Sequence, residues 1–182
     1  MQYEVANWGP FLATRERGRQ VREDVESKLS NLRTGETLVL SFASVEGITV
    51  SFGDECIAKL IVDRSVGLNT DRGFVISNAN EDVSETLEAV LSRRKLSAVS
   101  LTKFGKAMIV GERGWLPETL EAAIELQSFS AMELAEMLQL TPQAANNRLK
   151  VLVTTGAVAR DQIVPEGGGK EFCYTVVIPA FT

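Results

Sequence analysis

Amide and cationic side chains recur within one short segment of the chain, residues 141–150. Asn and Gln amides can form paired hydrogen bonds with the edge of an adenine base, and Arg and Lys can contact guanine or phosphate. The segment therefore predicts a surface able to contact double-stranded DNA. Its candidate contact residues are Thr141, Gln143, Asn146, Asn147, Arg148 and Lys150.

These side chains can act together if the segment forms a helix. Thr141 can cap the free amides at a helix start, and Pro142 suits the first helical position because it needs no backbone N–H there. Gly156 then ends the helix. The apolar residues expected to face inward are Ala145, Leu149, Leu152 and Val153. The candidate contact residues would remain for solvent or a major groove.

Two helices are expected before this one. The first begins near Pro117 and runs to about Gln127 with an apolar stripe. The second begins at Ser130, because its spacing to Glu133 is that of a capping box, in which each side chain binds a free backbone donor. A break of three residues, 140–142, then separates the second helix from the third, as in a helix-turn-helix.

A hairpin is expected after Gly156. One strand begins near Val158, and residues 172–178 alternate as its partner. The Gly-rich stretch 165–170 would form the tip between them. The hairpin carries two further cations that could contact DNA, Arg160 and Lys170.

Residues 115–178 resemble the MarR-like winged-helix regulators in this order of three helices and a hairpin. The resemblance implies an α+β winged helix-turn-helix domain whose third helix reads the major groove and whose hairpin forms the wing. Residues 115–182 nevertheless contain four basic and eight acidic residues. Because phosphate neutralisation supplies most non-specific affinity for DNA, the few cations would have to share one face. The alternative is a winged helix used only for protein contacts or dimerisation.

The first part of the chain alternates between strand and helix patterns. Helices are expected over 15–32, about 53–66 and about 83–95, and short β-type runs occupy 37–42, 73–77, 97–101 and 107–110. This alternation predicts an α/β sandwich with a partly parallel sheet. The linker candidate is Gly111–Gly114, so the expected domains are residues 1–113 and 114–182.

Residues 38–55 carry a second resemblance, which extends over roughly residues 11–111. A strand, a Val45–Glu46 loop and Ser51 at a helix start resemble the STAS fold of anti-sigma-factor antagonists, and more closely the STAS-like domain of unknown function, DUF4325. In the antagonists a Ser or Thr at this place is phosphorylated by a partner kinase. Ser51 is the matching position here, and a plain helix N-cap is its alternative role.

Catalytic chemistry has little support in the composition. The 182 residues include no histidine, which removes the usual general base and the usual nitrogen ligand for zinc. Cys56 and Cys173 are expected to be buried free thiols, and Asp54 and Glu55 to be ordinary charges on a helix surface. We therefore expect a protein that is not an enzyme and that has no catalytic residues, metal site or cofactor.

Composition and hydropathy predict a folded cytoplasmic protein, because no apolar run is long enough to span a membrane and no signal peptide is present. The leading hypothesis is a DNA-binding transcriptional regulator, acting as a homodimer, in which the STAS-like domain senses or dimerises. The rival hypothesis is a partner-switching adaptor whose STAS-like domain binds a regulatory protein, such as a sensor ATPase or an anti-sigma factor, without direct DNA binding.

Overall fold

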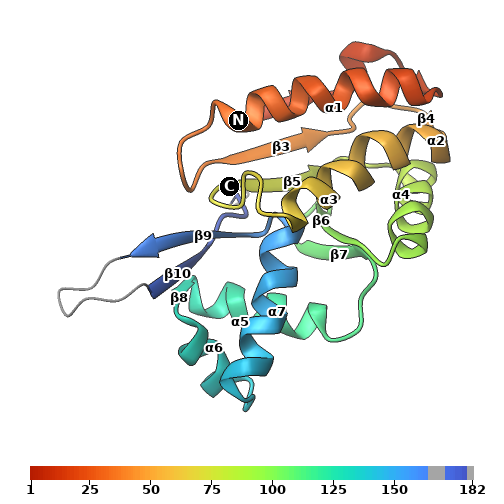
Figure 1. The fold of residues 1–182 in the computed structure, drawn as a ribbon. Helices are drawn as coiled ribbons and strands as arrows, with labels where there is room; N and C mark the ends of the chain where they lie inside the picture. Colours follow the sequence, from red (N-terminus) through yellow and green to blue (C-terminus); the bar gives the residue numbers. More distant parts are fainter. Residues whose placement is uncertain (164–170, 180–182) are drawn as a thin grey trace.

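The chain is folded around a mixed β-sheet. A computed structural model describes residues 1–163 and 171–179, and within them a five-stranded sheet has the strand order β1-β3-β5-β6-β7 (Figure 1). The first four strands in that order pair in parallel, and the last pairs antiparallel with its neighbour. Their bounds are β1 (Gln2–Glu4), β3 (Thr37–Ser41), β5 (Gly73–Ser77), β6 (Ser97–Leu101) and β7 (Ala107–Gly111). The expected α/β class, with a partly parallel sheet, is confirmed.

Helices of the N-terminal half cover one face of this sheet. Thr14 caps α1 (Arg15–Ser30), and Asn80 caps α4 (Glu81–Arg93). The other helical segments are consecutive: α2 (Val50–Gly53), the π-helical turn η2 (Asp54–Ala58) and α3 (Lys59–Ser65). Together they form one helix that begins earlier than the expected Gly53. Three short segments complete this half: η1 (Val5–Trp8), β2 (Phe11–Leu12) and β4 (Gly47–Ile48).

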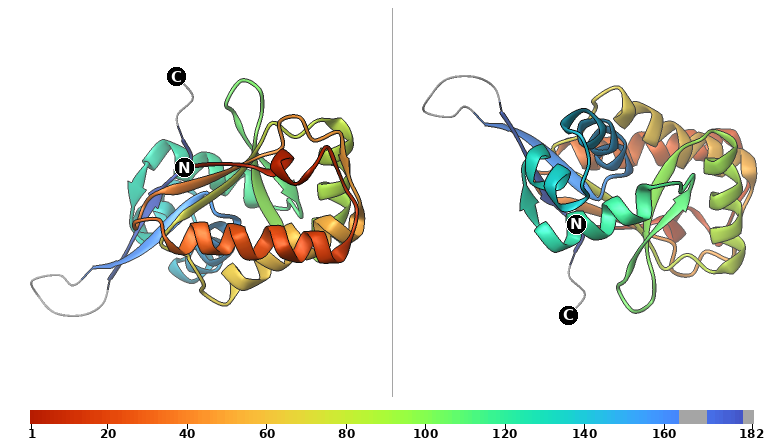
Figure 2. Two further views of the ribbon diagram at one scale, coloured as in Figure 1. Left: turned by 90° about the horizontal axis from the view of Figure 1, so that it is seen from above. Right: turned by 90° about the horizontal axis from the view of Figure 1, so that it is seen from below.

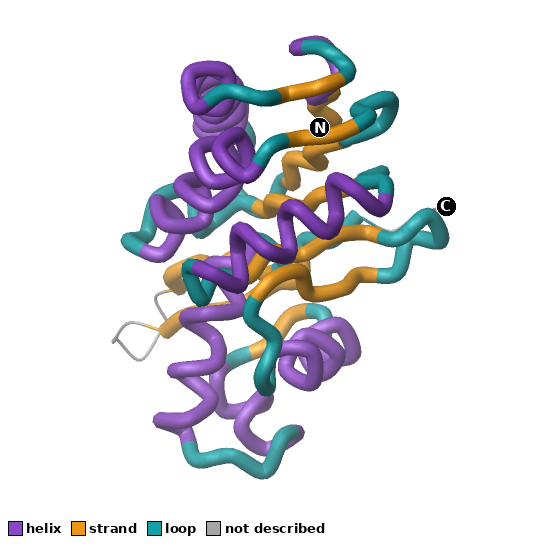
Figure 3. The backbone as a smooth tube through the Cα atoms, turned by 90° about the vertical axis from the view of Figure 1, so that its right-hand side faces the viewer, coloured by secondary structure: helices purple, strands orange, loops and turns teal. Residues whose placement is uncertain are grey.

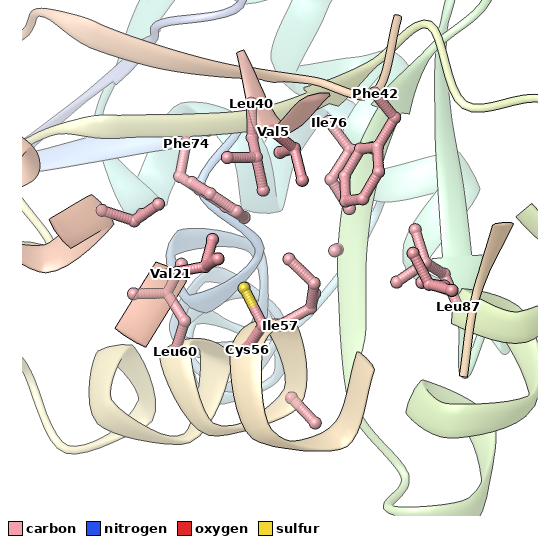
Figure 4. Close-up of a cluster of buried hydrophobic side chains, with 14 of the residues drawn as sticks. Val5, Val21, Leu40, Phe42, Cys56, Ile57, Leu60, Phe74, Ile76 and Leu87 are labelled. Carbon is pink, nitrogen blue, oxygen red and sulfur yellow. The ribbon is translucent and has the colours of Figure 1, made fainter. Parts of the chain in front are cut away.

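The hydrophobic core on this face joins strands to helices. Leu40, Phe74 and Ile76 point from the strands toward apolar side chains of α1 and of the α2–α3 helix (Figure 4). Those helical side chains include Val21, Cys56, Ile57 and Leu60. Their removal from water is the main stabilising term for this layer.

The C-terminal half packs on the opposite face. Its elements are α5 (Leu116–Leu126), β8 (Ser128–Phe129), α6 (Ala131–Met137), α7 (Pro142–Thr155), β9 (Val158–Ile163) and β10 (Glu171–Val176). The described parts of β8, β10 and β9 form an antiparallel sheet in that order. The three C-terminal helices lie at the end of the molecule away from α1 (Figure 3).

A second core holds the two halves together. Val75, Val99 and Ile109 point from the main sheet into the same apolar cluster as Leu120 and Leu152 of the C-terminal helices. In β5, Val75 therefore faces one core while its neighbours Phe74 and Ile76 face the other, as side chains alternate along a strand. The expected boundary near Arg113 thus separates two segments that share a core.

None of the helices among the described residues is long and apolar enough to cross a membrane.

Candidate functional site

The start of α7 is fixed by local hydrogen bonds that the sequence predicts. The Thr141 hydroxyl accepts a hydrogen bond from the Ala144 amide at 3.2 Å, and Pro142 is the first helical residue. Before it, α6 begins with the expected capping box: the Ser130 amide donates to the Glu133 carboxylate at 2.6 Å, and the Glu133 amide donates to the Ser130 hydroxyl at 3.3 Å. Both helix starts are confirmed.

The candidate contact residues of α7 form an exposed polar face. Gln143, Asn147 and Lys150 are all exposed, and their spacing of four and three residues places them on the same side of the helix. The Gln143 amide donates to the Asn147 side-chain oxygen at 3.4 Å. Asn146 is exposed beside them, with its side-chain amide donating to the Pro142 carbonyl at 2.9 Å. The structure therefore brings together four of the six candidate residues of this segment.

Arg148 lies on another side of α7. At 100° per residue it is about 140° around the helix from Gln143. Its guanidinium donates to the Glu118 carboxylate at 2.9 Å and lies over the Trp115 ring, 5.2 Å from its centroid. The expectation that Arg148 shares the exposed face is wrong, because its contacts with Trp115 and Glu118 hold the side chain on this other side of α7.

Of the two hairpin cations, Arg160 lies within the described residues and Lys170 does not. Arg160 is half-buried on β9, where its guanidinium lies over the Phe172 ring, 4.8 Å from the centroid. Its backbone amide donates to the Thr70 carbonyl at 3.0 Å, which joins β9 to the N-terminal half. Lys170 and the expected tip at 165–170 lie outside the described residues.

A buried arginine fixes the other end of α7. Arg64 of α3 is only 1% exposed. Its guanidinium donates to the carbonyls of Val153 at 3.1 Å and Thr154 at 3.2 Å, in the last turn of α7. It also donates to the carbonyls of Asn69 and Arg72. Burial lowers the pKa of Arg64 to about 10, so the side chain is still charged at neutral pH.

The positive charge of Arg64 suits the carbonyl groups at the end of α7. The last carbonyls of a helix lack partners within it and carry the negative end of its dipole, which favours a cation. Sequence reasoning missed Arg64, because an arginine in an amphipathic helix usually reaches solvent and its carbonyl partners come from distant segments.

Gly156 allows the same end of α7 to approach the main sheet. Its φ of 92° is in the left-handed region, and the Phe74 amide donates to its carbonyl at 2.9 Å. A Cβ atom built on Gly156 would lie 2.3 Å from the Phe74 carbonyl oxygen. Only a residue without a side chain fits this contact, so the direction in which α7 projects is fixed by the sheet.

Ser51 does not cap its helix. The cap is Thr49, whose hydroxyl accepts from the Phe52 amide at 3.3 Å. Ser51 is the second residue of α2 and is half-buried. The N-cap alternative for Ser51 is therefore wrong, since the helix begins at Val50, directly after Thr49, and Ser51 lies within it.

The carboxylates and thiols of the N-terminal half are also placed by the structure. Asp54 and Glu55 are buried, contrary to the expectation of surface charges, because α1 and α4 pack beside them. Asp54 accepts from Arg94 at 2.5 Å, which lowers the pKa of its carboxyl. Cys56 is a buried free thiol, as expected, and burial raises its pKa to about 12. Cys173 is also a free thiol but is only half-buried.

Among residues 1–163 and 171–179, no group of three or more His, Cys, Asp or Glu side chains is arranged to hold a metal ion.

The comparisons with known proteins concern the N-terminal half. The family model of a STAS-like domain of unknown function, DUF4325, matches residues 17–84. The match runs from α1 through the first turn of α4, so it covers β3, β5 and the α2–α3 helix. No curated protein and no solved structure matches the chain.

Proposed function

We propose that the chain is a DNA-binding transcriptional regulator whose residues 114–182 form a MarR-like winged helix-turn-helix domain. The order α5, β8, α6, α7, β9, β10, with three antiparallel strands, supports this assignment. In it α6 and α7 are the helix pair, α7 is the recognition helix, and β9 and β10 form the wing (Figure 1). The proposed activity is binding and includes no catalytic step.

The single observation that carries the proposal is the exposed polar face of α7. Gln143 and Asn147 present amides that suit adenine, and Lys150 presents a cation that suits guanine or phosphate. All three are exposed on a helix that begins and ends at fixed points. Such a preorganised face can enter a major groove without first ordering its backbone.

The distribution of charge is compatible with DNA binding. Five of the eight acidic residues of the C-terminal half lie on α5 and α6, at Glu118, Glu121, Glu125, Glu133 and Glu136, and Asp161 and Glu171 lie on β9 and β10. Lys150 and Arg160 lie instead on α7 and β9. A phosphate backbone laid along α7 would meet Lys150 and no acidic side chain of that helix.

The proposed role of the STAS-like domain is sensing or dimerisation. Recognition of an inverted repeat would require two copies of α7 about one helical turn of DNA apart, and hence a homodimer. Because Arg64 and the second core join α7 to the N-terminal half, a change in that half would alter the position of α7 in such a dimer.

The test is selection of fragmented genomic DNA on the purified protein at roughly 150 mM salt, where non-specific affinity is weak. A parallel selection uses a variant with Gln143, Asn147 and Lys150 replaced by alanine. The proposal expects wild type, and not the variant, to enrich one recurring site with half-sites about 10 base pairs apart. No enrichment by the wild type would contradict it.

One observation favours the second candidate, a partner-switching adaptor. Phe11 of β2 and Val50, the first residue of α2, are 60% and 47% exposed, and β2 pairs with β4, which ends just before α2. Apolar side chains exposed together often mark a protein contact. Affinity capture with wild type and with Phe11→Ser tests this function. The adaptor function requires a regulatory protein that the wild type retains and the variant loses. Recovery of the chain alone from both captures would contradict this function.

A further inference from the structure

A hollow of about 530 Å³ lies where the C-terminal part of α7 meets the N-terminal half. Its walls come from the end of α3 and the following loop, the turn between α4 and β6, one side of α7 and the described part of the β9–β10 hairpin. Both halves of the chain therefore contribute to the same surface feature.

The hollow is positively charged. The described residues that line it include four basic side chains and no acidic one; the basic side chains are Arg64, Lys95, Lys150 and Arg160. Arg64 is occupied by backbone carbonyls. Within residues 1–163 and 171–179, the other three form no ion pair. An anion at this surface would meet three cations that are not engaged in ion pairs among the described residues.

Lys95 stands out among them because its backbone is unfavourable for lysine. It follows Arg94, the C-cap residue of α4, and has a φ of 56°, in the left-handed region. The Lys95 amide donates to the Ser92 carbonyl at 3.0 Å, and the Leu96 amide donates to the Leu91 carbonyl at 2.9 Å. This pair of bonds is the Schellman motif, in which glycine is usual at the position that Lys95 occupies.

We propose that Lys95 is part of the DNA interface, so that the STAS-like half contacts a backbone phosphate while α7 lies in the adjacent major groove. This inference rests on the proposed function. A phosphate contact explains why a cation occupies a glycine position beside α7, and it adds positive charge that the acidic C-terminal half lacks. The footprint on DNA then includes both halves of the chain.

The test is fluorescence anisotropy with a labelled duplex of mixed sequence, about 30 base pairs or roughly three helical turns long. Titrations from about 50 to 200 mM salt compare wild type with Lys95→Gly, Lys95→Arg, Lys150→Gln and Lys103→Gln. Lys103 is an exposed lysine of the β6–β7 hairpin, whose tip projects on the opposite side of the molecule from α7 (Figure 2). It is the matched control.

Lys95→Gly removes the charge and relaxes the backbone, so it should unfold at a higher temperature than wild type and still bind DNA less tightly. The expected loss is several-fold, and the slope of log K against log salt should become shallower by about 0.9, the value for one phosphate contact. Lys95→Arg should retain the wild-type slope, and Lys103→Gln should be indistinguishable from wild type.

The outcomes separate this inference from the function on which it rests. If Lys150→Gln weakens binding while Lys95→Gly matches wild type in affinity and slope, DNA binding stands and the role of Lys95 is overturned. If Lys95→Gly and Lys103→Gln lose the same amount, the effect is one of net charge and the role of Lys95 is again overturned. If the wild type does not bind the duplex at the lowest salt, the proposed function fails and this inference fails with it.

Discussion

Single residues decide how α7 is held. Arg64 contributes its guanidinium to four carbonyls, two of them in the last turn of α7 and two in the loop that leads to β5. A buried charge is stabilising only when its partners are complete, and removal of one partner leaves the others unsatisfied. The charged guanidinium of Arg64 should therefore stabilise the fold through these four hydrogen bonds.

Arg64→Met should lower the free energy of unfolding by roughly 3 kcal/mol, because buried carbonyls lose their donors. Urea unfolding followed by circular dichroism measures this loss. The control is Arg19→Met on α1, whose ion pairs with Glu16 and Glu23 are exposed and should contribute little to stability. Equal losses for the two variants would contradict the assigned role of Arg64.

At the scale of elements, the contact between the end of α7 and β5 depends on a missing side chain. Both Gly156 and Gly35 have φ in the left-handed region, at 92° and 81°. A Cβ on Gly156 would collide with Phe74, whereas nothing lies within 4 Å of a Cβ on Gly35. An alanine at Gly35 would therefore introduce backbone strain alone, whereas an alanine at Gly156 would add a steric collision to that strain.

Gly35→Ala should cost about 1–2 kcal/mol, the ordinary penalty of a left-handed alanine, and Gly156→Ala should cost clearly more. Thermal unfolding of the two variants gives the comparison. Similar losses would mean that the helix end and β5 separate easily to accept the methyl group, contrary to the fixed placement of α7.

Elements with local signals could be predicted from the sequence. The starts of α6 and α7 follow from Ser130, Glu133 and Thr141, because capping depends on residues three apart. The apolar stripe of α4 likewise gave its buried face. By contrast, β1, β2, β4 and β8 have two or three residues each and exist through pairing with distant strands, so no local period reveals them.

The part of the candidate site that depends on the helical period could also be predicted from the sequence. The helical period places Gln143, Asn147 and Lys150 together, and applied to Arg148 it gives the different side that the structure shows. The roles of Arg64 and Lys95 could not be inferred, because each depends on segments far away in the sequence that packing brings beside α7.

At the scale of the whole molecule, the two halves are joined by a shared apolar core. Val75, Val99 and Ile109 of the main sheet would be exposed without the C-terminal helices. Because burial of apolar surface dominates stability, neither half should remain folded when the other unfolds. The chain should behave as one cooperative unit despite its two kinds of architecture.

The two tryptophans can test this cooperativity, since Trp8 lies in the N-terminal half and Trp115 precedes α5. In Trp8→Phe the remaining fluorescence reports the C-terminal half, and in Trp115→Phe it reports the N-terminal half. Within each variant, the urea midpoint by fluorescence should coincide with that by circular dichroism. Separate midpoints would show that the halves unfold independently.

The proposed reading of DNA sequence by the exposed face of α7 can be tested through the specificity ratio of Asn147→Ala. Equilibrium binding to a genomically selected fragment is compared with binding to an unrelated duplex at one salt concentration, with the exposed Asn7→Ala of η1 as control. Asn147→Ala should lose about 1–3 kcal/mol of discrimination, and Asn7→Ala should lose none. An unchanged ratio for Asn147→Ala would contradict sequence reading by this face.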